Sequence, residues 1–120
     1  MKYLLMICFA PDTWDGLTED QRREVFRTHD EFQRLVTESG ELVATEALAD
    51  PSHSVTVRVR AELPMVTDGP FAESKEYLAG YYVLDCENRD RAAELAGLLA
   101  EARFGAVEVR PLMTFDGAPI

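Results

Sequence analysis

Residues 77–113 read YLAGYYVLDCENRDRAAELAGLLAEARFGAVEVRPLM, and this stretch indicates how the chain folds. Its first part, Tyr77 to Cys86, is apolar almost throughout, which is typical of a strand that is covered on both faces. Asn88 can then cap a helix that ends near Gly105. The apolar stripe of that helix consists of Ala92, Leu95, Leu99 and Ala102. A closing strand over 106–113 completes a predicted β-α-β unit.

The N-terminal part of the chain predicts a second β-α-β unit. Residues 2–9 form an apolar strand, and residues 12–16 form a loop. Thr18 and Gln21 have the spacing of a helix-capping box, so a helix is expected from there to about Ser39, before Gly40. A strand over 41–48 follows. The apolar stripe of the helix consists of Val25, Phe32 and Val36, with His29 in the same line and with Phe26 and Leu35 beside it.

A hairpin is predicted between the two units, because residues 54–60 alternate valine with polar residues and 63–67 follow after a short turn. Pro64 cannot donate to a ladder, which places the second arm at a sheet edge. The whole order predicts a ferredoxin-like α+β fold (βαββαβ with an extra hairpin) with both helices on one face of the sheet. We expect one domain over 1–115 and a tail over 116–120.

The opposite face of such a sheet would be bare and apolar, since its central strands carry apolar residues on both faces. Pairing two sheets face to face would cover it, so we expect a homodimer. The 120 residues are 47% hydrophobic and 28% charged, which excludes a disordered chain. The net charge of -10 would repel phosphate, so neither nucleic acid nor an anionic membrane is an expected partner.

No membrane segment is expected, because the longest apolar run, Tyr3 to Pro11, is well short of the roughly 18 residues that a membrane helix needs. Cys8 and Cys86 lack the spacing of a disulfide framework or a zinc site, so we predict free thiols in a cytoplasmic protein. The sequence contains no glycine-rich phosphate loop. We therefore predict no metal and no cofactor.

Three stretches give the chain a family resemblance. Residues 66–85, VTDGPFAESKEYLAGYYVLD, resemble the signature of the YCII-related, or DGPF-domain, family, and residues 1–7 and 107–111 also look like that family. The resemblance implies a dimeric α/β barrel built from ferredoxin-like subunits. Some relatives are enzymes that act on small organic molecules, including lyases that remove chloride from chlorinated hydroquinones. DGPF-type members are often encoded beside alternative sigma factors.

The resemblance also implies an active site. In the YCII branch a histidine of the first helix pairs with an acidic residue at the start of the next strand; His29 and Glu41 match these positions, with glutamate where the branch prefers aspartate. An imidazole can take and give a proton near neutrality, and a bonded carboxylate fixes its tautomer. The alternative is that His29 is a packing residue on an apolar helix face.

The segment Asp68-Gly69-Pro70-Phe71 predicts a rigid loop beside a central strand, in which Gly69 permits positive φ and Phe71 anchors the loop to the core. Such loops often form one wall of a binding site. The charged residues at its rim, Glu73, Lys75 and Glu76, are either part of that wall or a solvated surface. Substrate-binding roles are therefore predicted for Asp68, Gly69, Pro70, Phe71 and Lys75, and for Asp12 and Trp14 after the first strand.

The remaining polar residues have plainer interpretations. If their strands are parallel neighbours, Cys8 and Cys86 lie near the same end of the sheet. They could then form a redox pair, although burial makes such thiols inert. His53 is expected at the surface. Packing and dimer contacts, rather than acid catalysis, are the expected roles of Tyr77, Tyr81 and Tyr82.

Together these features favour an enzyme of the lyase or isomerase type that transfers protons without a cofactor, with His29 as general acid or base and Glu41 as its partner. The alternative is a non-catalytic module that binds a ligand or a protein and is linked to sigma-factor regulation. A structural dimer without a ligand is the third possibility.

Overall fold

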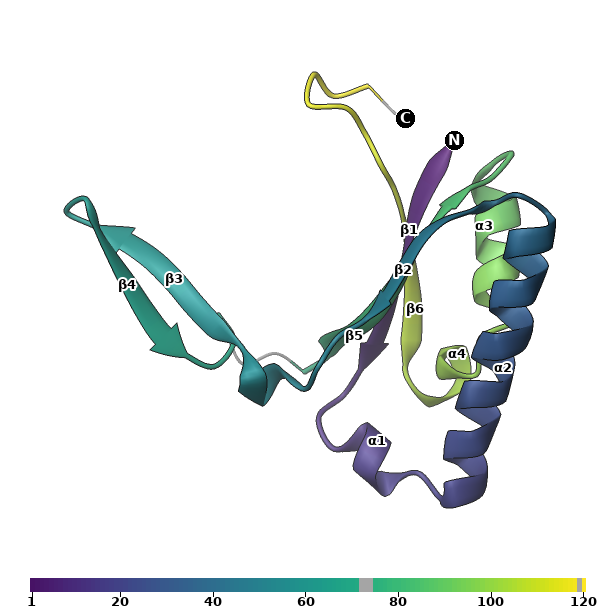
Figure 1. Ribbon diagram of the computed structural model, residues 1–120, viewed down its shortest axis with the longest axis horizontal. Helices are drawn as coiled ribbons and strands as arrows, with labels where there is room; N and C mark the ends of the chain where they lie inside the picture. Colours follow the sequence, from purple (N-terminus) through teal and green to yellow (C-terminus); the bar gives the residue numbers. More distant parts are fainter. Residues whose placement is uncertain (72–74, 119) are drawn as a thin grey trace.

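The computed structural model describes residues 1–71, 75–118 and 120 (Figure 1). Its main sheet has four strands in the order β2-β5-β1-β6, and each neighbouring pair is antiparallel. These strands are β1 (Lys2–Phe9), β2 (Leu42–Ala47), β5 (Tyr77–Asp85) and β6 (Ala106–Pro111). The helices on one side of it are α2 (Glu19–Glu38), α3 (Arg89–Ala96) and α4 (Glu101–Phe104). The predicted ferredoxin-like α+β fold is confirmed.

The core lies between this sheet and the helices. Alternate residues of β1 are buried, as the two-residue period of a strand requires, and α2 buries residues at helical spacing. The buried residues of these two elements are Tyr3, Leu5, Ile7 and Phe9, and Val25, Thr28, Phe32 and Val36. Each fully buried apolar side chain contributes about 1.5–3 kcal/mol. Because His29 shares the inward stripe of α2, the packing of this helix aims the imidazole at the sheet.

The N-terminus of α2 has the predicted capping box: Gln21 N–H donates to Thr18 Oγ1 at 3.1 Å, and Thr18 N–H donates to Gln21 Oε1 at 2.8 Å. The segment before it is not only loop, because α1 (Thr13–Gly16) forms one helical turn. Arg22 donates two hydrogen bonds, at 2.9 and 3.1 Å, to the carbonyl oxygen of Trp14. This contact fixes the turn, and with it the Trp14 indole, against the start of α2.

The second helix is interrupted where a single helix was predicted. α3 ends at Ala96 with Gly97 as its C-cap, and the amides of Leu98 and Leu99 then bond to carbonyls three residues back. This tighter turn rotates the chain before α4 begins. The prediction that Ala102 belongs to the buried stripe is therefore wrong: Ala102 is exposed, and Glu101 is turned inward with 3% of its surface exposed.

The interruption is tied to α2 by a buried threonine. Thr28 Oγ1 accepts a hydrogen bond from the amide of Ala100 at 3.2 Å and donates one to the carbonyl of Val25 at 3.0 Å. The backbone just before α4 is thus held against the helix that carries His29. This contact places Glu101 opposite the imidazole.

The predicted hairpin forms a separate two-stranded sheet of β3 (Val55–Arg60) and β4 (Leu63–Asp68), preceded by the short helix η1 (Pro51–His53). It projects away from the side of the main sheet that carries the helices (Figure 1). Its valine row is therefore not buried by the body of this chain. Six of its apolar side chains are at least half exposed: Val55, Val57, Val59, Leu63, Met65 and Val66.

The segment predicted as a tail returns to the start of β1. The amide of Lys2 donates to the carbonyl of Ile120 at 2.6 Å, and the amide of Ile120 donates to the carbonyl of Leu112 at 3.1 Å. The two ends of the chain consequently lie near each other (Figure 1).

The two cysteines lie at opposite ends of the sheet. β1 and β5 are antiparallel, so Cys8 pairs with Leu78 near one end, whereas the amide of Cys86 donates to the carbonyl of Met1 at the other end. The hypothesis that parallel strands bring Cys8 and Cys86 together is wrong, because a strand inserted into a β-α-β crossover runs opposite to its neighbours. Both thiols are free.

We expect Cys86 to react slowly while the chain is folded. Burial, helped by the neighbouring Glu41 carboxylate, raises the pKa of the Cys86 thiol to about 11, so little reactive thiolate is present near pH 8. In a Cys8→Ser variant, a disulfide reagent should modify Cys86 roughly tenfold or more slowly in buffer than in denaturant. Equal rates in the two conditions would contradict this burial.

Candidate functional site

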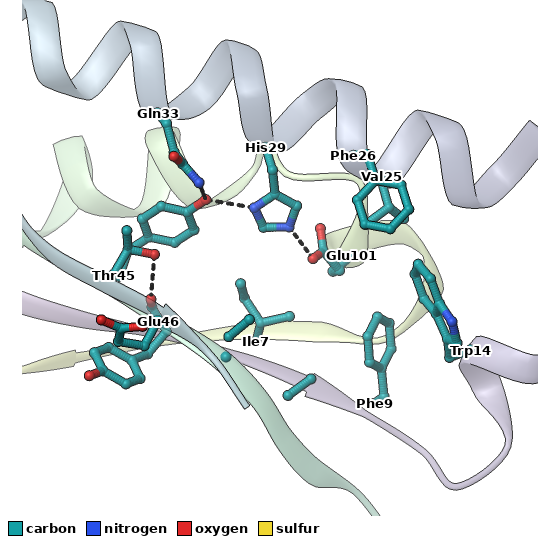
Figure 2. Close-up of a pocket in the computed structure, with 15 residues that line it drawn as sticks. Ile7, Phe9, Trp14, Val25, Phe26, His29, Gln33, Thr45, Glu46 and Glu101 are labelled. Carbon is teal, nitrogen blue, oxygen red and sulfur yellow. Dashed lines mark hydrogen bonds and ion pairs between the residues drawn. The ribbon is translucent and has the colours of Figure 1, made fainter. Parts of the chain in front are cut away.

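A cavity of about 360 Å³ lies between α2 and the sheet. Its apolar wall is formed mainly by Ile7, Phe9, Trp14, Val25 and Phe26. Its polar end is formed by His29, Gln33, Tyr82 and Glu101 (Figure 2). The His29 side chain keeps 20% of its surface exposed, so the imidazole is reachable through the cavity rather than sealed in the core.

Both ring nitrogens of His29 have partners (Figure 2). Nδ1 lies 2.6 Å from the Tyr82 hydroxyl, and Nε2 is hydrogen-bonded to Oε2 of Glu101. The Tyr82 ring also lies nearly parallel to the imidazole, with planes 12° apart and centroids 5.7 Å apart. A carboxylate, an imidazole and a phenol therefore form one connected row at the polar end of the cavity.

Tyr82 bears on the tautomer of His29. Its hydroxyl accepts a hydrogen bond from Gln33 Nε2 at 3.3 Å and lies 2.6 Å from Nδ1, to which it can donate its own proton. Burial is the main cause that raises the pKa of Tyr82, which keeps this proton in place at neutral pH. With Tyr82 as the donor to Nδ1, the imidazole proton lies on Nε2 and is donated to Glu101, and this is the tautomer that we predict.

Glu101 is the partner of His29 that the sequence interpretation missed. In an uninterrupted helix its side chain would point away from the stripe of Leu95 and Leu99; the tight turn after Gly97 brings it inward. Gly97 within the predicted helix was the available signal, because glycine is a weak helix former and often ends helices. Tyr82 was predicted to serve in packing, and it does so while also bonding to His29.

Glu41 does not contact His29. Its two carboxylate oxygens accept hydrogen bonds from Arg91, at 2.9 and 3.1 Å, and one of them also accepts a bond from Ser39 at 2.8 Å. The predicted His29–Glu41 pair is therefore not formed, since α3 supplies a guanidinium that fits both oxygens of the carboxylate. The bond from Arg91 is the main cause that lowers the pKa of Glu41.

This ion pair predicts a pH dependence of stability. A carboxyl group whose pKa is lowered by folding contributes stability above its unfolded pKa of about 4.3, and that contribution is lost as the pH falls through the folded value. Glu41→Gln should lower the free energy of unfolding by about 1–2 kcal/mol at pH 7 and reduce its loss on acidification. Urea unfolding between about pH 7 and pH 3 measures both effects. If the free energy of unfolding falls equally with pH in the unaltered protein and in Glu41→Gln, the stabilising role of the Glu41–Arg91 pair is contradicted.

The other predicted binding residues are dispersed. Trp14 lines the His29 cavity, while Asp12 lines a neighbouring hollow of about 340 Å³ that also touches Trp14. Pro70 and Phe71 line a further hollow of about 560 Å³ beside His53 and Tyr77.

The loop of residues 68–71 is thus not a wall of the His29 cavity. Gly69 has the predicted positive φ of 93°. Phe71, however, is 71% exposed and lies under the guanidinium of Arg58 at 4.7 Å, so it does not anchor the loop in the core. Asp68 ends β4, Lys75 is exposed, and Glu73 lies outside the described residues.

Within the described ranges, no three His, Cys, Asp or Glu side chains are grouped so that they could hold a metal ion. No helix of that same part of the chain has the length and apolar character needed to cross a membrane.

The fold and the site define an α+β protein with a histidine–carboxylate pair at the end of a small apolar cavity. Residues 1–116 match the YCII-related domain, and the chain belongs to this family. It is also 39% identical, over 99 residues, to an uncharacterized protein of Rhizobium meliloti (strain 1021), a match that covers 81% of this chain and 78% of the relative. The family resemblance drawn from the sequence is confirmed.

Proposed function

We propose that the protein is a cofactor-independent enzyme of the lyase or isomerase type that moves a proton on a small organic molecule. The observation that carries this proposal is the row Glu101–His29–Tyr82 at the polar end of an apolar cavity. Cavities with apolar walls and a few converging polar groups are the usual form of small-molecule sites.

In this proposal His29 and Glu101 act as one acid–base unit. A ligand proton presented to Glu101 is taken up at Oε1, while Oε2 keeps its hydrogen bond to Nε2 of His29. The pair returns the proton at another position of the ligand, or to water after a leaving group departs, so protons balance without a cofactor. Tyr82 acts as a positioning residue, because its hydroxyl holds Nδ1 and fixes the ring.

Solvent-deuterium exchange tests this function without knowledge of the natural substrate. The protein would be incubated in D₂O with a panel of small ketones that carry an apolar ring, and deuterium at the carbon beside the carbonyl would be followed by NMR. We expect exchange above the buffer rate for ketones that fit the cavity. Binding of such ketones without any exchange would contradict the enzymatic proposal.

One observation favours the non-catalytic alternative, a binding module linked to sigma-factor regulation. Both ring nitrogens of His29 are already engaged by side chains of the protein, as in a purely structural histidine. A ligand that binds in the cavity and is never exchanged or converted would support this alternative.

We also propose that two copies associate, in the cytoplasm, where free thiols persist. The support is the apolar row Leu4, Met6 and Cys8 on the sheet face away from the helices, together with the exposed apolar side chains of the hairpin. Light scattering should give twice the chain mass of 13.5 kDa. Met6→Lys should reduce the measured mass to that of one chain. A measured mass of one chain for the unaltered protein would contradict the pairing.

A further inference from the structure

One oxygen of the Glu101 carboxylate has no partner within the described residues. Glu101 is 3% exposed, its Oε2 is engaged by His29, and its Oε1 is buried without a hydrogen-bond donor (Figure 2). A buried carboxylate oxygen is stabilised by a donor, and leaving one without a donor is costly. Glu101 lines the cavity, so a bound molecule that presents an N–H or O–H group would supply it.

The charged residues that line the cavity indicate which kind of hydrogen-bond donor it would bind. Two described lining residues, Glu46 and Glu101, are carboxylates, whereas none of the described lining residues is Lys or Arg. His29 is the one described lining residue that can carry a positive charge, so it can balance at most one of the two carboxylates. A bound anion would therefore face more carboxylates than cations in the lining, while a bound cation would be attracted.

The walls of the cavity suit the rest of such a molecule. Phe9, Trp14 and Phe26 form a continuous aromatic surface: the Trp14 ring centroid lies 6.4 Å from that of Phe9 and 5.6 Å from that of Phe26. Aromatic faces attract cations as well as apolar groups. A volume of about 360 Å³ accommodates a molecule with a single ring.

From these contacts we infer that the cavity selects small apolar molecules that carry a protonated amine, with the ammonium group bound at Oε1 of Glu101. This inference rests on the site of the proposed function and names the class of ligand for it.

Three probes that share a ring and differ in their polar group test the inference: benzylamine, benzyl alcohol and benzoate. Each would be titrated into the ¹⁵N-labelled full chain near neutral pH, and amide shifts around the cavity would be fitted. We expect millimolar binding of benzylamine that is roughly tenfold or more tighter than binding of benzoate, with benzyl alcohol between them. Equal binding of benzoate, or no benzylamine binding up to about 20 mM, would overturn the inference.

Two matched variants locate the attraction. Glu101→Gln should weaken benzylamine about tenfold and change benzyl alcohol by less than about threefold, since only the charge is removed. Glu46→Gln removes the same charge from an exposed residue and should change benzylamine by less than about threefold. Equal losses in both variants would overturn the assignment to Glu101. If Glu101→Gln does not fold, the ranking of the three probes with the unaltered protein still decides.

The failure of this inference is distinguishable from failure of the proposed function. If the protein selects amines but exchanges deuterium into no ligand, the inferred ligand class stands and the enzymatic proposal is contradicted. If it exchanges deuterium into ketones but does not select amines, the enzymatic proposal stands and the inferred ligand class is contradicted.

Discussion

Tyr82→Ala is expected to lower the free energy of unfolding by about 3–5 kcal/mol, the range found for loss of a large buried ring. Tyr82 is 1% exposed, its ring meets Phe32 edge-on with centroids 4.7 Å apart, and its hydroxyl lies 2.6 Å from Nδ1 of His29. Because small domains are stable by only about 5–15 kcal/mol in total, this loss is a large fraction of the free energy of unfolding. Urea unfolding followed by circular dichroism measures the change.

Tyr82→Phe is the matched control, because it keeps the ring and removes only the hydroxyl. It leaves Nδ1 of His29 and the amide of Gln33 without this partner, so we expect a loss of about 1–2 kcal/mol. The difference between the two variants separates packing from hydrogen bonding. Equal losses of unfolding free energy in the alanine and phenylalanine variants would mean that packing of the Tyr82 ring does not stabilise the core around the site.

His29→Asn is expected to have the largest effect on activity. Asparagine keeps a polar side chain of similar reach but cannot relay a proton near neutrality, so the deuterium exchange rate should fall by about 10²–10⁴-fold. The exchange assay on a ketone that the unaltered protein deuterates gives this rate directly. The fold should survive, since His29 is partly exposed and not one of the fully buried side chains.

Glu41→Gln is the control for this second effect. Glu41 was expected beside His29 from the family resemblance, yet it is bonded to Arg91 and Ser39. We therefore expect a deuterium exchange rate within about twofold of that of the unaltered protein, since the row Glu101–His29–Tyr82 stays intact. A loss in Glu41→Gln comparable to that in His29→Asn would show that the pairing with Glu101 is not the one that matters.

The fold was predictable because its determinants are local. The apolar alternation of β1, the capping box of Thr18 and Gln21, and the valine row of β3 each specify an element from neighbouring residues. The alternation could not show that the hairpin stands apart from the main sheet, because exposed and buried valines have the same pattern. That distinction depends on which surface, if any, covers the strand.

The site was predictable only in part, because it depends on the relative rotation of two helices. His29 could be placed on the inward stripe of α2 from its spacing to Val25 and Val36. Glu101 could not, since a continuous helical period turns it outward, and the break after Gly97 together with the bond from Ala100 to Thr28 reverses this. Glu41 matches the acidic position that the family resemblance implies, but the guanidinium of Arg91 on α3 binds it instead.

The central claim is that the His29 imidazole is held between Tyr82 and Glu101 with its proton on Nε2. Long-range ¹H–¹⁵N NMR of the histidine ring at about pH 8 tests it most directly, because the two nitrogens differ in shift according to which carries the proton. We predict the Nε2–H pattern in the unaltered protein and in Glu41→Gln, and a changed pattern in Glu101→Gln. An averaged spectrum of both tautomers in the unaltered protein, or a larger change in Glu41→Gln than in Glu101→Gln, would contradict the account.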